Sequence, residues 1–242
     1  MESSNDLRLA VLFDADNVPS SSLKGIMEEV ARYGNPTFKR IYGDWTKPNL
    51  TGWKQILIEH AITPVQQYGY TSGKNSTDSA MIIDAMDILY SGKADGFCIV
   101  SSDSDFTRLA VRLREAGMKV IGIGEKKTPS SFRVACDKFI YIEIINSASD
   151  EKKETTSDKI SKPSRKEVIN IFVNSINDLA DEEGWAYLGD VGNLILKKQP
   201  DFDPRNYGYQ KLTPLIKNLN RFDIDERKTD NSNTKHIFIR NK

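Results

Sequence analysis

Strand-like apolar runs alternate with helical segments along the first part of the chain. The runs cover residues 9–13, 38–42, 62–66, 96–100, 119–123 and 139–142. Helical spacing of apolar residues is clearest at 78–90 and 106–116, and Pro19 predicts a further helix that begins there. Regular alternation of strands and helices predicts an α/β fold, a parallel sheet flanked by helices.

A polar stretch then interrupts this pattern. Residues 146–163 read NSASDEKKETTSDKISKP and contain almost no apolar residues. Such a segment cannot bury a face, so we expect a flexible linker. It separates a first domain, residues 1–145, from a second domain, residues 164–242.

The second domain shows a different order of elements. Helical patterns at residues 165–183, 188–197 and 207–218 precede two alternating, strand-like segments at 222–225 and 236–239. Three helices followed by a hairpin predict a small α+β winged-helix domain. We expect its aromatic residues Trp185, Phe202 and Tyr207 to lie in the core.

The composition excludes several classes of protein. Lys plus Arg and Asp plus Glu number 34 each, so the net charge gives no argument for a polyanionic partner. Two cysteines and two histidines are too few for a disulfide scaffold or a typical zinc site. No stretch approaches the roughly 18 apolar residues of a membrane span, and the N-terminus lacks the order of a signal peptide. We therefore expect a cytoplasmic protein without a membrane partner.

Carboxylates gather where predicted strands end. Asp14 follows the first strand, with Asp16 and Asn17 just after it, and Asp103 and Asp105 follow the fourth. Asp78 begins the helix before the fourth strand. Sites in open α/β sheets form at the carboxyl ends of strands, and carboxylates held there repel each other. Hard oxygen ligands without His or Cys indicate Mg²⁺ or Mn²⁺, which activates water and stabilises phosphoryl charge.

A simpler interpretation exists for some of these residues. Asp78, Ser102 and Asp103 each suit the N-cap of a helix, where Asp and Ser are ordinary. Asp14 follows a buried strand instead, and for it a functional site is the better interpretation. Taken together, the acids favour a metal site.

Three motifs carry a resemblance to a known family. FDADN, KNSTD and SSDSDF, followed by a helix and KVIGIG, resemble the NYN domain of the bacterial LabA-like, PIN-like nucleases across residues 7–145. The resemblance implies a PIN-like fold and RNA cleavage with Mg²⁺ or Mn²⁺. It implies that the catalytic, metal-binding acids are Asp14, Asp78, Asp103 and Asp105. The family often has Gly where Ala15 and Ser102 stand, which affects the turn but removes no ligand.

Other residues near these motifs have roles that the resemblance or their position suggests. Asn17 matches the family Asn that orients an acid or a phosphate, and Lys74 is a candidate contact for the scissile phosphate. Asp84, six residues after Asp78, is a weaker candidate ligand. For the aromatic residues Trp45 and Tyr68 we favour packing at the rim over base stacking.

The second domain carries its own resemblance. WAYLGDVG at residues 185–192 and PDFDPRNYGY at 200–209 resemble the OST-HTH domain, also called LOTUS. Members of that family are winged helices that bind RNA, and some bind protein partners. Arg205, Lys211 and Lys217 lie on or near the predicted third helix and are candidate phosphate contacts.

These observations predict a metal-dependent ribonuclease with an accessory RNA-binding domain, acting on single-stranded RNA. Two alternatives remain open. One is a catalytically silent RNA-binding adaptor. The other is a haloacid dehalogenase-like phosphatase, because Asp14-x-Asp16 follows a strand; Asn17 and Pro19 fit that family poorly.

Overall fold

The computed structural model describes residues 6–68, 76–149, 165–229 and 232–242. The chain divides into two units between Lys152 and Lys153. Lys74 and residues 150–163 of the predicted linker lie outside the described residues. The domain boundaries therefore stay a prediction.

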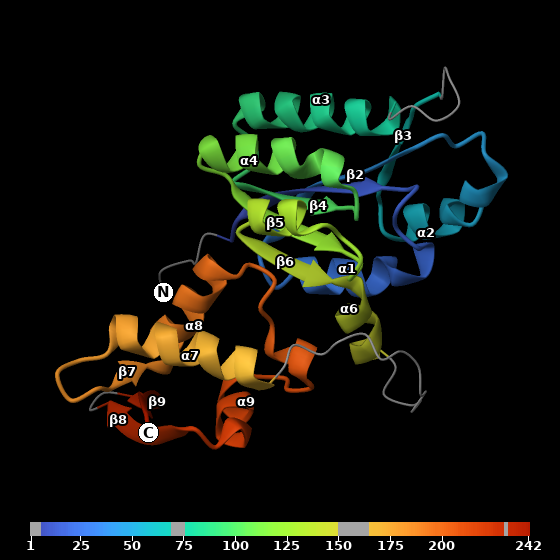
Figure 1. The fold of residues 1–242 in the computed structure, drawn as a ribbon. Helices are drawn as coiled ribbons and strands as arrows, with labels where there is room; N and C mark the ends of the chain where they lie inside the picture. The colour runs from blue at the N-terminus through green and yellow to red at the C-terminus, as the bar shows by residue number, and fades with distance from the viewer. Residues whose placement is uncertain (1–5, 69–75, 150–164, 230–231) are drawn as a thin grey trace. The chain divides into compact units, whose positions relative to one another are not determined.

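The first unit is built on a parallel sheet of six strands (Figure 1). Its order is β3-β2-β1-β4-β5-β6, and every neighbouring pair is parallel. The strands are β1 (Arg8–Asp14), β2 (Asn35–Gly43), β3 (Thr63–Gln66), β4 (Gly96–Val100), β5 (Lys119–Gly124) and β6 (Lys138–Tyr141). The central strands β1 and β4 are buried on both faces, which accounts for their continuous apolar runs.

Helices cover both faces of this sheet, as Figure 1 shows for α1 on one side and α3 and α4 on the other. One core packs α1 (Leu23–Val30), α2 (Trp53–Glu59) and α6 (Ile142–Ser149) against one face. The second core packs α3 (Ser76–Ser91), α4 (Thr107–Glu115) and α5 (Ser130–Ala135) against the other. The three short 3₁₀ turns are η1 (Ser20–Ser22), η2 (Pro48–Leu50) and η3 (Ser104–Phe106). The predicted α/β, PIN-like architecture is confirmed.

The order of the strands determines where the acidic residues named in the sequence analysis lie in the sheet. From β1 the chain moves outward through β2 and β3, and from β4 it moves outward in the other direction through β5 and β6. The order therefore reverses between β1 and β4, and open α/β sheets form their sites at the carboxyl ends of strands where the order reverses. Phe13 pairs with Val100 in register, so Asp14 and Ser101 emerge side by side at this point.

Two predicted boundaries in this unit differ from the structure. The segment after Pro19 begins as the 3₁₀ turn η1, and the α-helix starts only at Leu23. The last strand ends at Tyr141, and α6 extends to Ser149. Ile142, Ile144 and Ile145 are buried, so burial of apolar residues lengthens the ordered unit into the stretch that composition alone assigns to a linker.

The second unit has the predicted winged-helix elements. They are α7 (Arg165–Leu179), β7 (Ala186–Tyr187), α8 (Leu188–Lys198), η4 (Pro204–Tyr207), α9 (Leu212–Leu219), β8 (Phe222–Thr229) and β9 (Ser232–Asn241). The strands form an antiparallel sheet in the order β7-β9-β8. Phe172 at the centre of the core meets Phe202 and Phe222 edge to face, with ring centroids 5.8 and 6.0 Å apart.

Two expectations for this unit were wrong, and one strand was not predicted. The third helix does not run from 207 to 218, because Gly208 adopts φ +86° and ends η4 before α9 begins at Leu212. The two-residue strand β7 was not predicted. Trp185 does not lie in the core with Phe202 and Tyr207; it contacts Arg227 and Arg240 instead.

Candidate metal and nuclease site

A hydroxyl group joins the ends of β1 and β4. Ser101 Oγ donates to Asp14 Oδ2 at 2.7 Å and accepts from the backbone N–H of Asp103 at 3.1 Å. Asn17 Nδ2 also donates to Asp14 Oδ2, at 2.6 Å, and the N–H of Asp16 donates to Oδ1 at 3.1 Å. Asp14, which is 1% exposed, is therefore held in one orientation from both strands.

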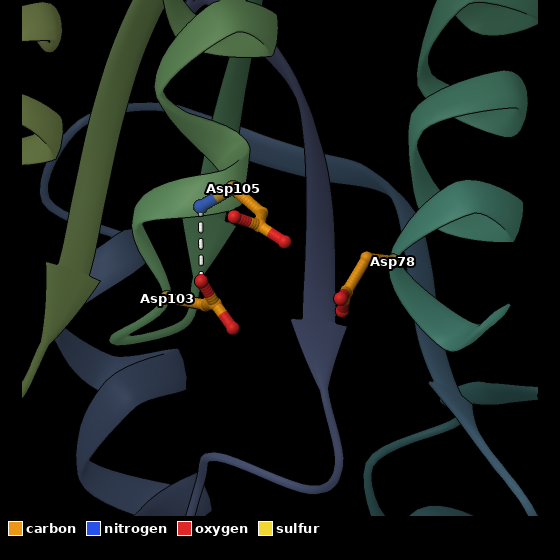
Figure 2. Close-up of side chains that lie close together, drawn as sticks. All are labelled: Asp78, Asp103 and Asp105. Carbon is orange, nitrogen blue, oxygen red and sulfur yellow. Dashed lines mark hydrogen bonds between the residues drawn. The ribbon is translucent and has the colours of Figure 1, made fainter. Parts of the chain in front are cut away.

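Three carboxylates converge beside this pair of strand ends. Asp78 from the first turn of α3, Asp103 from the segment after β4 and Asp105 from η3 each offer an oxygen, and these oxygens lie within 4.8 Å of one another. Figure 2 shows the Asp78 side chain extending from its helix toward the other two. The N–H of Asp105 donates to Asp103 Oδ1 at 2.9 Å and fixes their spacing (Figure 2). Asp103 thus caps η3 and also belongs to the cluster, so the N-cap and metal-site interpretations both apply to it.

The electrostatics of the cluster show an accumulation of negative charge. Burial, followed by the charges of Asp14, Asp103 and Asp105, raises the pKa of Asp78 to about 6. Burial also raises the pKa of Asp14, while the hydrogen bonds from Ser101 and Asn17 oppose that rise. Bringing a divalent cation to the cluster would relieve this repulsion.

The sequence-based candidates separate in the structure. Asp78, Asp103 and Asp105 form the group of mutually close oxygens, and Asp14 lies outside that group but near enough for its charge to affect Asp78. Asn17 contacts the acid Asp14, one of the two functions its motif implies.

Asp84 has a different function. It accepts hydrogen bonds from Arg40 and from the hydroxyl of Tyr42, and both of these residues lie on β2. Tyr42 is fully buried, and the ion pair with Arg40 neutralises Asp84. This arrangement ties α3 to β2 and so supports the helix that carries Asp78.

The basic candidates in the second unit also differ from one another. The side chain of Arg205 donates to Asp203, from Nε to Oδ1 at 3.0 Å and from Nη2 to Oδ2 at 2.7 Å, and it is only 12% exposed. Lys217 pairs with Glu226 at 3.2 Å in an exposed position, and Lys211 is exposed at the N-cap of α9. Lys74 lies outside the described residues.

Ser101 is a residue of the candidate site that sequence reasoning did not single out. Its signal is a hydroxyl directly after a buried strand that neighbours the strand ending in Asp14. The aromatic residue Trp45 packs against the core, and its Nε1 donates to the carbonyl of Val65 at 3.0 Å. Packing, which we favoured for both Trp45 and Tyr68, is confirmed for Trp45, whereas Tyr68 is 56% exposed.

Comparisons with known proteins match both units. Residues 8–143 match the NYN domain family, and residues 159–234 match the OST-HTH/LOTUS domain family. No curated protein matches the chain. Within the ranges that the structure describes, no helix has the length and apolar character needed to cross a membrane.

Three solved structures are similar to parts of the chain. A Vibrio parahaemolyticus protein of unknown function is 20% identical over 59% of this chain and 96% of its own, with a TM-score of 0.49. An uncharacterized protein from Nitrosomonas europaea is 34% identical, covering 38% and 91%, with a TM-score of 0.28. Residues 175–257 of a Chromobacterium violaceum protein are 31% identical, covering 36% and 87%, with a TM-score of 0.26. TM-scores below 0.5 give no basis for a functional conclusion.

Proposed function

Because the chain belongs to the NYN domain family and also carries an OST-HTH/LOTUS domain, we propose that it is a metal-dependent ribonuclease. The observation that carries the proposal is the convergence of Asp78, Asp103 and Asp105. Their carboxylate oxygens are the hard ligands that Mg²⁺ and Mn²⁺ take. The family match also favours a nuclease over a haloacid dehalogenase-like phosphatase.

The residues of the chain have distinct functions in this proposal. Asp78, Asp103 and Asp105 would hold the cation, which when bound neutralises charge and activates water for attack on a phosphodiester. Asp14 is buried and lies outside this group of ligands, and Ser101 and Asn17 orient its carboxylate. Asp84 positions α3 through Arg40 and Tyr42.

The second unit supplies affinity for RNA. OST-HTH/LOTUS domains bind RNA, and we extend this to unpaired RNA as the substrate of the whole chain. A protein partner for this domain is the alternative that the family resemblance allows. Both cysteines are free and buried, which suits a reducing compartment, and we place the reaction in the cytoplasm.

Cleavage assays test the proposal. The protein is incubated with unpaired RNA and with DNA in Mg²⁺, Mn²⁺ or EDTA, and RNA cleavage should require the metal. Asp103→Asn should abolish cleavage and leave the fold intact. Asp87→Asn is the matched control, because it removes the same charge from an exposed position on α3. Metal-dependent RNA binding without cleavage would instead indicate a silent adaptor.

Limited proteolysis tests the proposed division of the chain. The stretch from 150 to 163 contains one apolar residue, Ile160, so the first cut should fall there and yield two folded fragments. A first cut within residues 20–140 would contradict the domain boundaries.

A further inference from the structure

The three-stranded sheet of the second unit has two chemically different faces. Side chains alternate along its strands, so Ala186, Ile224 and Ile239 face the core. The residues between them face the opposite way. On that outer face lie Trp185, Tyr187, Arg227, Phe238 and Arg240, which we call the sheet platform.

The rings and guanidinium groups of the sheet platform contact one another. Arg227 Cζ lies 4.1 Å from the ring centroid of Phe238, and Arg240 Cζ lies 4.6 Å from that of Trp185. The Tyr187 ring is 5.7 Å from the Phe238 ring, centroid to centroid. Aromatic rings and arginine planes therefore form one continuous layer over the sheet, whose three strands lie together in Figure 1.

Packing of the core does not account for this layer. The core of the unit closes on the other face of the sheet, and Tyr187 keeps 37% of its surface exposed. Isolated exposed rings are ordinary, whereas here the exposed ring of Tyr187 lies beside the half-buried rings of Trp185 and Phe238, and rings gathered in this way are typical of an interaction surface. Gly189 supports the arrangement, because a Cβ there would come within 2.6 Å of the Tyr187 ring.

We propose that the sheet platform binds unpaired RNA by stacking nucleobases on its rings and guanidinium planes, an inference that rests on the proposed function. Unpaired bases expose flat faces that stack on aromatic residues and on arginine, whereas a duplex hides them. In this inference the RNA-binding surface of the second unit is the outer face of its sheet and not its third helix.

The charges around the sheet platform favour bases over phosphates as the main contact. Arg227 pairs with Asp225 at 2.8 Å and Arg240 with Asp223 at 3.1 Å, so the two cations are already balanced. Charge attraction to a phosphate backbone is then weak, and stacking supplies most of the affinity. A partner protein with an apolar surface would in turn have to bury two arginine–aspartate pairs, which is costly.

Binding measurements on the full chain in EDTA test this inference, because EDTA prevents cleavage. The probe is an unstructured RNA of about 12 nucleotides, alone or annealed to its complement. Tyr187→Leu should weaken binding of the unpaired RNA by about fivefold to 150-fold, the range of one base–aromatic stack. Tyr187→Phe keeps the ring and should bind like the wild type.

Arginine variants separate stacking from charge. Arg240→Lys keeps the charge but loses the planar guanidinium, so it should weaken binding several-fold. Lys211→Ala, on the third helix, is the matched control and should change affinity by less than Tyr187→Leu. Thermal unfolding of each variant shows that the domain stays folded.

Three results would overturn the inference. The first is tighter binding of the duplex than of the unpaired RNA, and the second is an equal loss of RNA affinity in Tyr187→Phe and Tyr187→Leu. The third is loss of RNA binding in Lys211→Ala while the platform variants keep it. Cleavage at saturating RNA in Mn²⁺ is measured in parallel and should be retained by the platform variants. If the protein binds unpaired RNA but does not cleave it, the proposed ribonuclease activity is refuted, while the inference about the sheet platform is kept. If the wild type cleaves RNA and Tyr187→Leu binds RNA as tightly as the wild type, only the inference about the sheet platform is refuted.

Discussion

Replacing Asp78 with asparagine tests the charge repulsion that defines the site. In the folded protein the pKa of Asp78 is raised to about 6, whereas an unperturbed Asp has a pKa of about 3.9. At a pH between these two values, Asp78 is ionised in the unfolded chain but still protonated in the folded protein. The free energy of unfolding of the metal-free protein therefore falls as the pH rises from about 4 to about 6, and then levels off. The amide side chain of the Asp78→Asn variant does not titrate, so the variant lacks this fall.

The magnitude follows from the size of the pKa shift. A shift of about 2 units corresponds to about 3 kcal/mol, and solvent around the exposed Asp105 screens part of the repulsion. We therefore expect the Asp78→Asn variant to gain about 1–2 kcal/mol of unfolding free energy relative to the wild type between pH 4 and pH 7. Because the unfolding free energies are compared between two pH values, any effect of the substitution on helix α3 that does not depend on pH cancels.

Urea unfolding in EDTA measures the effect at unit steps from pH 4 to pH 8. Asp87→Asn, on the same helix, should follow the wild-type profile throughout. Adding Mn²⁺ should stabilise the wild type and the Asp87→Asn variant, and stabilise Asp78→Asn much less, because the cation binds the folded site. Parallel profiles for Asp78→Asn and wild type would refute the argument that this carboxylate is destabilised when ionised.

Further predictions concern residues outside the acidic cluster. Asp84→Asn should lower the free energy of unfolding by about 1–3 kcal/mol in urea, since it breaks the ion pair with Arg40, while Mn²⁺ affinity measured by titration calorimetry should fall less than in Asp78→Asn. Arg205→Ala should cost about 3 kcal/mol of stability by removing the guanidinium that pairs with the buried carboxylate of Asp203, whereas Lys211→Ala should cost less than about 0.5 kcal/mol; urea unfolding of both variants checks this. Burial raises the pKa of Cys98, and raises that of Cys136 to about 12, so a thiol-reactive dye should label neither until the protein is unfolded.

The sheet and its acidic edge could be predicted because their signals are local. A buried parallel strand needs a run of apolar residues, and β1 and β4 show such runs directly before Asp14 and Ser101. The rule that sites form at the carboxyl ends of strands then places these residues together. The confirmed family resemblance rests on the same short stretches.

What could not be predicted is which partner each charged residue has in the folded chain. Asp84 resembles a ligand candidate in the sequence, yet Arg40, 44 residues earlier, neutralises it. Arg205 resembles a phosphate contact, yet its own turn places it against Asp203. In both cases a charged residue is used within the fold, and only the pairing partner reveals it.

Trp185 shows a further limit of sequence reasoning. A tryptophan in a small domain is expected in the core, because burying its large ring stabilises the fold. The strand β7 is only two residues long, however, and Trp185 immediately precedes it. Alternation therefore places Trp185 and Tyr187 on the outer face while Ala186 faces the core, an arrangement that follows only once Ala186 is known to pair with Ile239.

The two units together give the chain complementary properties. In the proposed function the acidic cluster would hold a cation and, without one, would repel the phosphates of RNA, so it would contribute chemistry and little affinity. A strongly basic RNA-binding surface would draw nonspecific polyanions, and the balanced composition of the chain does not supply one. Stacking on the sheet platform offers affinity that needs no net charge and selects RNA whose bases are unpaired. We therefore expect RNA whose bases are unpaired to be the preferred substrate of the proposed ribonuclease.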